Sequence, residues 1–233
     1  YSKNHMKLMK EALQLIDMNI ACSNKVMEAY KELFKVDRIK VIHNLINEKR
    51  IYEKSLKKSQ FDFGSDKIKL ITVARFHHQK GLDRLIRIYS QLDAYYDLTI
   101  VGDGELKEEL YSLANKCGVL DQIRWTGILA NPYPEIRHSD LFVMPSVYEG
   151  YPTITIESLI SGTPVLTTEV AGVKEQLTEP QYGYVVENSE EALFAKLNYL
   201  KDKKELLRKY KEALKDYHYD NESILDEYYK IFN

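Results

Sequence analysis

Short apolar runs rich in β-branched residues alternate with amphipathic helical patterns from about residue 68 to residue 186. In the first unit, the run Ile68–Ala74 precedes apolar residues at helical spacing between Gly81 and Leu92. The order then recurs, and we expect strands at 68–74, 98–101, 122–126, 140–144, 163–167 and 183–186. Repeated strand and helix units predict a parallel sheet with helices on both faces, which is a doubly wound α/β fold.

The segment after Gly150 is ambiguous between strand and helix. Residues 153–156 read Thr-Ile-Thr-Ile, and strands favour such β-branched side chains. Pro152, however, suits a first helical position, and Ser161-Gly162 suits the end of a helix. The segment has the length of a crossover helix between two parallel strands. We therefore predict a buried helix here.

The two ends of the chain differ from its middle. Residues 3–16 and 23–34 have helical patterns, while 19–22 and 39–42 resemble short strands, and the first residue is Tyr1 instead of Met. Because two short strands cannot form a core alone, we expect the sequence to be part of a longer protein. The predicted divisions are the end of a missing N-terminal domain (1–46), a polar linker (47–64), a ligand-binding domain (65–216) and a C-terminal helix that crosses back to the N-terminal domain (217–233).

The charge balance argues against one class of partner. The 233 residues include 33 Lys and Arg against 35 Asp and Glu, which gives a formal net charge of -2. A protein that binds nucleic acid through its phosphates carries an excess of basic residues. We therefore expect no nucleic acid partner.

Cysteine usage and hydropathy indicate a location. Cys22 and Cys117 lie far apart without Cys-x-x-Cys spacing, which is typical of a reducing compartment. No apolar run approaches the roughly 18 residues of a membrane span, and the N-terminus lacks a signal-peptide pattern. We expect a cytoplasmic protein, in which a peripheral position at the inner membrane face would depend on the missing domain.

The loop after the first expected strand carries two permanent cations. Arg75 and Lys80 lie five positions apart, at the beginning of the next helix. A helix N-terminus favours anions, and an arginine fork with a lysine point charge suits a diphosphate. A solvated basic loop is the alternative. His77 and His78 lie between the cations without an acidic or cysteine companion at ligand spacing, so we expect no metal site.

A glycine-rich turn, Gly102-Asp103-Gly104, follows the second expected strand. A dinucleotide-binding fingerprint needs a third glycine three positions later, and Lys107 occupies that position. The hydride-transfer interpretation therefore loses its best support. The glycines still permit close approach of the backbone to a ligand, and a tight strand-to-helix turn without a ligand is the alternative.

Two glutamates follow the fourth expected strand. Glu149 lies in the turn, and Glu157 falls in the second turn of an otherwise apolar helix. Burying a carboxylate costs several kcal/mol unless a donor satisfies it, so Glu157 should face a ligand or a donor. Sugar hydroxyls suit such carboxylates. A catalytic acid and base acting on a glycosidic bond is a second possibility, and a capping Glu149 with a salt-bridged Glu157 is a third.

In combination, these features resemble the nucleotide-sugar-binding domain of the retaining GT-B glycosyltransferases of family 4. The similarity covers about residues 36–187, and Ile42-His43-Asn44 resembles the family's lead into its linker. It implies the Rossmann-like half of a GT-B fold. The matching elements, in order, are Arg75 with Lys80-Gly81, Val-Gly-Asp-Gly at 101–104, Trp125-Thr126-Gly127, 140–146, Glu149 and Glu157 around Gly150-Tyr151-Pro152, 162–165, and Gly172 to Glu175.

The resemblance implies a role for each matching residue. Arg75 and Lys80 would hold the donor diphosphate, Glu149 would contact the donor sugar, and Glu157 would contact the ribose hydroxyls. These roles make Arg75, Lys80 and Glu149 the predicted catalytic residues. The remaining predicted contacts are Gly102 and Gly104 near the ligand, Gly127 and Ile128 near the base, and Gly150, Tyr151, Pro152, Thr153 and Ile154 near phosphate and sugar oxygens.

The predicted function is transfer of a sugar, with retention of configuration, from a nucleotide-diphosphate sugar to an acceptor such as a growing polysaccharide or a glycolipid. A UDP-sugar is the favoured donor, and neither a cofactor nor a metal is expected. The acceptor would be bound by the missing domain, so this donor-binding chain should be inactive alone. A nucleotide-sugar epimerase or hydrolase of GT-B shape, and a non-catalytic nucleotide-sugar-binding module, are the alternatives.

Overall fold

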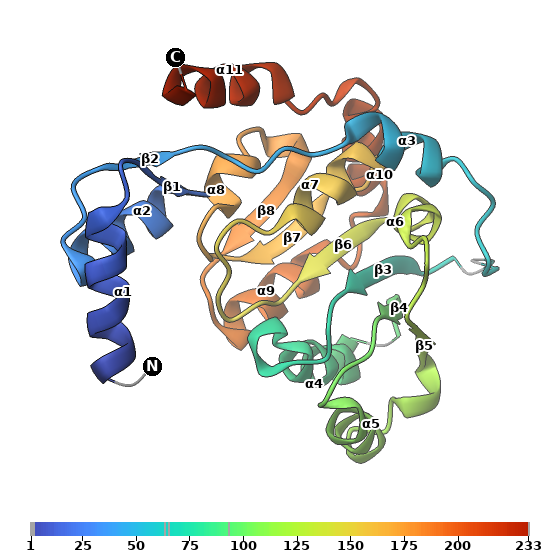
Figure 1. Ribbon diagram of the computed structural model, residues 1–233. Coiled ribbons are helices and arrows are strands. Elements are labelled where there is room, and N and C mark those ends of the chain that lie inside the picture. The colour runs from blue at the N-terminus through green and yellow to red at the C-terminus, as the bar shows by residue number, and fades with distance from the viewer. Residues whose placement is uncertain (1–2, 63, 65, 93, 233) are drawn as a thin grey trace.

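The computed structural model contains a six-stranded parallel sheet with helices on both of its faces (Figure 1). It describes residues 3–62, 64, 66–92 and 94–232. The predicted segments 1–46, 47–64, 65–216 and 217–233 include residues 1–2, 63, 65 and 93, and 233, which lie outside the described residues.

The strand order of the sheet is β5-β4-β3-β6-β7-β8, and every neighbouring pair is parallel. Counted along the chain within this sheet, the order is 3-2-1-4-5-6, in which the winding reverses between β3 and β6. The predicted doubly wound α/β fold is therefore confirmed. Its strands are β3 (Ile68–Val73), β4 (Tyr96–Val101), β5 (Ile123–Gly127), β6 (Leu141–Met144), β7 (Val165–Thr168) and β8 (Gly183–Val186).

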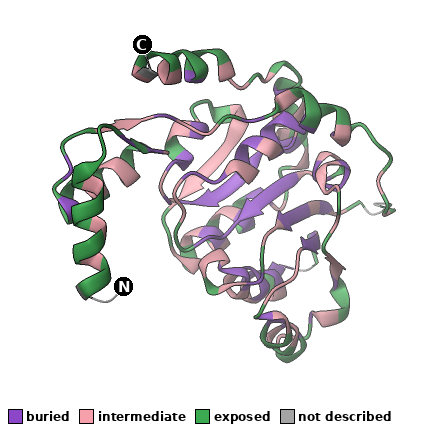
Figure 2. Ribbon diagram, viewed as in Figure 1, coloured by how far each residue is buried: buried purple, intermediate pink, exposed green. Residues whose placement is uncertain are grey.

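Helices cover both faces of the sheet, so the central strands β6 and β7 are buried on both sides, whereas the edge strand β8 is of intermediate burial (Figure 2). One face packs Leu70 and Leu98 against four helices, and the opposite face packs Ile71 and Phe142 against three others. The first four helices are α4 (Leu82–Leu92), α5 (Lys107–Lys116), α9 (Glu190–Leu200) and α10 (Lys204–Ala213). The other three are α6 (Tyr133–His138), α7 (Thr153–Ile160) and α8 (Val173–Gln176).

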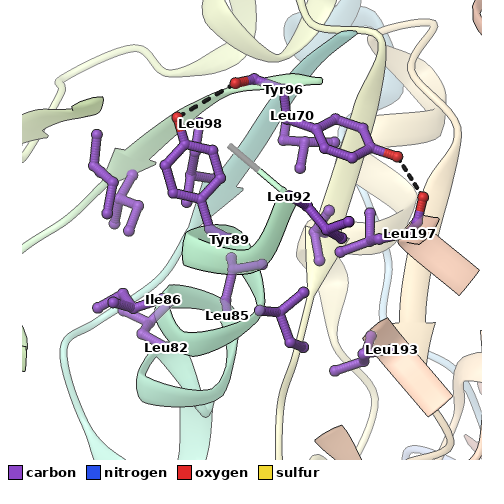
Figure 3. Packing of buried hydrophobic residues seen from close by; sticks show 14 of the residues in the cluster. Leu70, Leu82, Leu85, Ile86, Tyr89, Leu92, Tyr96, Leu98, Leu193 and Leu197 are labelled. Carbon is purple, nitrogen blue, oxygen red and sulfur yellow. Dashed lines mark hydrogen bonds between the residues drawn. The ribbon is translucent and has the colours of Figure 1, made fainter. Parts of the chain in front are cut away.

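Two buried tyrosines belong to the core beneath α4 and α9 (Figure 3). The Tyr96 hydroxyl donates to the Leu197 carbonyl at 2.5 Å, and the Tyr89 hydroxyl donates to the Tyr96 carbonyl at 3.3 Å. Burial raises the pKa of Tyr96. Because both hydroxyls have partners, these large rings contribute apolar contact without leaving an unsatisfied polar group.

The ambiguous segment after Gly150 forms the helix α7, as predicted. Pro152 immediately precedes the helix, and Gly162 follows it with a φ of +80°. Ile156 and Leu159 are completely buried. Burial of this apolar face outweighs the strand propensity of the Thr-Ile-Thr-Ile sequence.

The N-terminal residues form a smaller unit beside the main sheet (Figure 1). Its two short strands pair in parallel. The last helix, α11 (Asn221–Phe232), returns to this unit, because Glu227 pairs with Lys40 at 2.5 Å. The elements of the unit are α1 (Lys3–Leu15), β1 (Asn19–Ala21), α2 (Asn24–Phe34) and β2 (Ile39–Val41).

Part of the stretch that we predicted as a linker is helical. Helix α3 (Glu48–Ser55) packs against α6 and α7 and buries Ile51 and Ser55. Its sequence is too polar to predict a packed helix, because Ile51 is its only apolar residue that is fully buried. The remaining elements are the short 3-10 helices η1 (His78–Lys80), η2 (Leu120–Gln122), η3 (Pro180–Tyr182) and η4 (Leu214–Asp216).

Within the described ranges, every helix is too short or too polar to cross a lipid bilayer.

Candidate functional site

A cavity of about 930 Å³ opens at the carboxyl ends of the strands. Val73 and Arg75 reach it from the end of β3, and Glu149 and Ile154 reach it from the segment after β6. These are the two strands between which the winding of the sheet reverses, and in doubly wound folds ligands bind at that point. The volume is typical of small-molecule sites. We call it the switch-point cavity.

Most of the predicted site residues line this cavity. Gly127, Gly150 and Glu157 do not, although the Gly127 carbonyl accepts the Gly102 amide at 2.9 Å and so lies directly behind the lining. The predicted residues in the lining are Arg75, Lys80, Gly102, Gly104, Ile128, Glu149, Tyr151, Pro152, Thr153 and Ile154.

Lys80 and Glu149 form an ion pair in the wall of the cavity. Lys80 Nζ lies 2.6 Å from Glu149 Oε1, and the two side chains are 25% and 8% exposed. The same carboxylate accepts the Ser146 hydroxyl at 2.8 Å and the Gln79 amide at 3.3 Å. A carboxylate has about four acceptor positions, so Glu149 holds Lys80 in place and keeps about one position for another donor.

Arg75 occupies a more exposed part of the lining. Its side chain is 71% exposed and donates to Glu105 at 3.1 Å. The Glu105 carboxylate also lies 3.6 Å from His77 Nε2. The Arg75 and His77 side chains help to keep the pKa of Glu105 below its usual value, although the main cause is a backbone hydrogen bond. An exposed pair of this kind is weak, so an anion in the cavity can recruit Arg75 at little energetic cost.

The glycine-rich turn is required by packing. A Cβ on Gly102 would lie 1.9 Å from the Ala74 carbonyl oxygen, and the residue has a φ of +138°. A Cβ on Gly104 would lie 2.5 Å from the Phe76 carbonyl oxygen. The loops after β3 and β4 therefore touch through backbone atoms, which supports the interpretation of a tight turn and still leaves both glycines in the cavity lining.

The N-terminus of α7 points its first turn at the cavity. Pro152, Thr153 and Ile154 are in the lining, and among the residues that the structure describes no side chain caps this end of the helix. The first backbone N–H groups of a helix lack partners within the helix, and the helix dipole favours an anion there. An uncapped helix start beside Lys80 and Arg75 is therefore suited to a phosphate group.

Glu157 already has a protein partner. It is half-buried on α7, and its carboxylate accepts a hydrogen bond from the Tyr133 hydroxyl. Burial, together with this carboxylate, raises the pKa of Tyr133 to about 12. This arrangement supplies the donor that we expected for Glu157, and it places the side chain outside the lining of the cavity.

The N-terminal unit supports the loop that carries Gly150 and Tyr151. The Ser23 hydroxyl donates to the Gly150 carbonyl at 2.8 Å, and a Cβ on Gly150 would lie 3.3 Å from Cys22 Sγ. The His43 ring stacks on the Tyr151 ring, with centroids 4.7 Å apart and planes inclined by 15°. Gly150 is therefore a packing residue, and Tyr151 lies between the cavity and the N-terminal unit.

A second contact ties this unit to α8. His43 Nε2 lies 3.0 Å from a Glu175 carboxylate oxygen, and the Asn24 side chain donates to the same carboxylate at 2.7 Å. Glu175 belongs to the Gly172 to Glu175 motif, which the sequence suggested only as part of a family pattern. Its contacts are structural.

The sequence did not predict several lining or supporting residues. Ser146 and Gln79 orient Glu149, and Leu129 and Pro132 line the apolar side of the cavity. Ser146 lies two residues after the apolar strand β6, and this position could have indicated a residue of the site. Leu129 and Pro132 carry no signal of their own, because only the tertiary fold brings their loop to the cavity.

Comparison with known proteins decides the family. Residues 53–217 match the sequence model of the family described as glycosyl transferases group 1, and this match spans most of the chain. The chain belongs to this family. The predicted resemblance is therefore confirmed, and the match includes every residue that lines the switch-point cavity.

Two relatives illustrate how much of a group 1 glycosyltransferase is present. An uncharacterised glycosyltransferase of Methanocaldococcus jannaschii is 31% identical over 63% of this chain and 37% of its own length. The Campylobacter jejuni N-acetylgalactosamine-N,N'-diacetylbacillosaminyl-diphospho-undecaprenol 4-alpha-N-acetylgalactosaminyltransferase is 28% identical over 76% of this chain and 48% of its own length. The chain thus spans less than half of either relative.

Solved structures of group 1 glycosyltransferase shape share the fold. Anabaena HepE, solved in complex with UDP and glucose, matches all of this chain and 67% of its own chain with a TM-score of 0.82 at 16% identity. Staphylococcus aureus TarM, solved with UDP among its ligands, matches 99% of this chain and 47% of its own chain with a TM-score of 0.81 at 21% identity. The described fold is therefore the Rossmann-like half of a GT-B architecture.

Proposed function

We propose that this chain is the donor-binding part of a retaining glycosyltransferase that uses a nucleoside-diphosphate sugar, with a UDP-sugar as the favoured donor. The proposal rests on one observation. Lys80, Arg75 and the uncapped start of α7 all line the same cavity. Each is a group that favours an anion, and together they suit the diphosphate of such a donor.

The diphosphate is the leaving group of the proposed reaction. As the bond from the anomeric carbon to the phosphate oxygen breaks, negative charge grows on the diphosphate, and preorganised cations and amides stabilise it. Lys80 is held for this task by Glu149, and Arg75 becomes available by leaving its exposed pair with Glu105. Neither contribution needs a metal ion.

The two glutamates suggest where the sugar and the ribose of the donor would bind. Glu149 keeps about one acceptor position, enough for one sugar hydroxyl. Glu157 lies outside the lining but four residues after Thr153, so it shares one face of α7 with a residue at the rim of the cavity. A ribose hydroxyl at that rim would donate to Glu157 in competition with Tyr133.

The acceptor step is proposed on the family resemblance alone. An acceptor hydroxyl attacks the anomeric carbon on the face that the diphosphate leaves, and the departing phosphate oxygen takes the hydroxyl proton. The new glycosidic bond keeps the configuration of the donor. The relatives' names, which include lipopolysaccharide core biosynthesis enzymes of Rhizobium meliloti, support a polysaccharide or lipid-linked acceptor bound by the part of the protein outside this chain.

Calorimetric titration of the chain with UDP, GDP and their sugars tests the proposal. We expect saturable binding of nucleoside diphosphates, and weaker binding to the Lys80→Ala variant. Lys174→Ala is the matched control, because Lys174 also pairs with a glutamate but lies outside the cavity lining. No binding, or equal losses in both variants, would contradict the proposal.

The same preparations separate the alternative functions. A hydrolase would release free sugar from the donor without an acceptor, and an epimerase would change the configuration of the donor sugar. The proposed donor-binding part should do neither. Chromatography of a UDP-sugar after incubation with the chain detects either change.

A further inference from the structure

Residues 145–149, which we call the glutamate loop, carry Glu149 into the wall of the switch-point cavity. The loop follows β6 and contains no helix or strand of its own. Its backbone therefore needs hydrogen-bond partners from outside the loop. The Val147 N–H donates to the Gln79 carbonyl at 2.7 Å, and the Gln79 side chain donates to the Tyr148 carbonyl at 2.9 Å. The place of Glu149 thus depends on residues that precede α4.

Arg84, in the first turn of α4, holds the same loop from outside the lining of the cavity. Its guanidinium donates to the Pro145 carbonyl at 2.5 Å and to the side-chain oxygen of Asn188 at 3.0 Å. Asn188, which follows β8, in turn donates to the Val147 carbonyl at 2.7 Å. One guanidinium therefore holds two carbonyls of the glutamate loop, the first directly and the second through Asn188.

Gly81 leaves the space that this contact needs, directly after Lys80 in the chain. A Cβ on Gly81 would lie 2.2 Å from the Pro145 carbonyl oxygen and 2.9 Å from Arg84 Nε. The φ of Gly81 is +59°, which glycine adopts without strain. The hydrogen bond between Arg84 and Pro145 therefore packs against the backbone next to Lys80. It fastens the loop that carries Glu149 beside the residue that Glu149 binds.

The stability of the fold depends little on the charge of Arg84. Arg84 Nε is buried and, in the part of the chain that the structure describes, has no hydrogen-bond partner. A buried donor without a partner costs free energy, and burial lowers the pKa of Arg84 below its usual value. The apolar packing of α4 on the sheet comes from other residues, which include Leu82, Leu85 and Ile86 (Figure 3). We therefore look for the role of Arg84 in the position of the loop.

We propose that Arg84 is a positioning residue of the donor site, which fixes the glutamate loop so that Glu149 holds Lys80 in the cavity wall. This role rests on the donor-binding function proposed above. Arg84 lies outside the lining, so it acts through the loop and not by contact with the ligand. The planar fork of a guanidinium can hold two acceptors at once, whereas a lysine offers a single nitrogen.

Calorimetric titration of the full chain with UDP tests the role of Arg84. Arg84→Leu and Arg84→Lys should each weaken UDP binding at least about threefold, as is typical of residues in one hydrogen-bond network. Arg84→Lys keeps the positive charge, so it separates the position of the loop from a general attraction between the chain and an anion. It is also the safer variant for folding, which urea denaturation checks.

Arg137→Leu is the matched control. Arg137 is also a partly buried arginine that donates to a backbone carbonyl, that of Ser161 at 3.3 Å, but it lies before β6 and outside the cavity lining. This variant should bind UDP as the parent chain does. A loss in Arg137→Leu equal to that in Arg84→Leu would show a general effect of removing an arginine and would overturn the proposal.

A double-mutant cycle separates positioning from a merely structural role. In a chain that carries Glu149→Ala, the carboxylate that Arg84 is proposed to position is absent. Arg84→Leu should then change UDP affinity by less than about twofold. Equal fold losses with and without Glu149 would overturn the proposal, because Arg84 would then act independently of that carboxylate.

Two further outcomes distinguish this inference from the function on which it rests. UDP binding that is unchanged in Arg84→Lys would overturn the positioning role alone, because charge without the fork would then suffice. A parent chain that does not bind UDP would overturn the donor-binding function, and the role of Arg84 with it.

Discussion

At the scale of single residues, the site depends on contacts between backbone atoms that only glycine allows. Gly102 combines a positive φ with a Cβ position 1.9 Å from the Ala74 carbonyl oxygen. Gly118 also has a positive φ, of +74°, but a Cβ there would have no neighbour within 4 Å. The two positions separate the effect of backbone conformation from the effect of crowding.

Alanine substitutions at these two glycines should therefore differ in stability. Gly118→Ala should lower the free energy of unfolding by about 1–2 kcal/mol, the cost of a left-handed conformation. Gly102→Ala should lower it by about 2–5 kcal/mol, because crowding adds to that cost. Urea denaturation of both variants measures the difference, and equal losses would contradict the packing role of Gly102.

The two glutamates show how far single residues can be predicted. The requirement that a half-buried carboxylate has a donor was met, because Tyr133 donates to Glu157. The donor came from α6, which is close to α7 only in the folded chain, so no spacing in the sequence could identify it. Likewise, the Lys80 to Glu149 ion pair joins residues 69 positions apart. The sequence indicated Lys80 and Glu149 as residues of the site, but it did not indicate that Glu149 holds Lys80 in place.

At the scale of elements, periodicity predicted the sheet and the helices that pack on it, because burial imposes the pattern. It failed for α3, where one buried isoleucine and the packing against α6 and α7 stabilise a helix within a polar stretch. Secondary structure there depends on tertiary contacts that a local pattern does not contain.

The N-terminal unit offers an element-scale prediction. Its His43 ring stacks on Tyr151, which lines the switch-point cavity. Stacked rings contribute about 0.5–1.5 kcal/mol, so His43→Ala should weaken UDP binding roughly 2- to 10-fold by loosening the loop.

His43→Phe should retain most of the affinity, because it keeps a ring and loses only the contact with Glu175. His5→Ala serves as the control, since His5 is an exposed residue of α1 and lies outside the lining of the cavity. Calorimetry with UDP distinguishes the variants, and an unchanged affinity in His43→Ala would show that the unit does not position Tyr151 for the ligand.

At the scale of the whole molecule, the cations of the switch-point cavity predict binding without a metal ion. Arg75, Lys80 and the start of α7 all line the cavity in which we propose that the diphosphate binds. UDP affinity should therefore be the same with and without EDTA. Binding that disappears with the chelator and returns with Mg²⁺ would contradict the proposed electrostatics.

The partial coverage of the relatives leads to a second prediction for the whole chain, which concerns its transfer activity. Because the chain spans less than half of the Methanocaldococcus jannaschii and Campylobacter jejuni relatives, we expect it to bind donor nucleotide weakly and to transfer no sugar to an acceptor. A transfer assay with a UDP-sugar and a lipid-linked or oligosaccharide acceptor checks this. Robust transfer by residues 1–233 would show that the catalytic groups lie within this chain.

The most direct test of the central claim compares Lys80→Ala with Glu157→Gln in calorimetric titrations against UDP and inorganic pyrophosphate. Lys80→Ala should remove a charge-assisted contact of about 1.5–3 kcal/mol and weaken both ligands roughly 10- to 150-fold. Glu157→Gln should weaken UDP only, because pyrophosphate has no ribose and loses a repulsive charge. If both variants weaken pyrophosphate equally, Glu157 has no ribose role and the assignment of the cavity to a nucleoside diphosphate is contradicted.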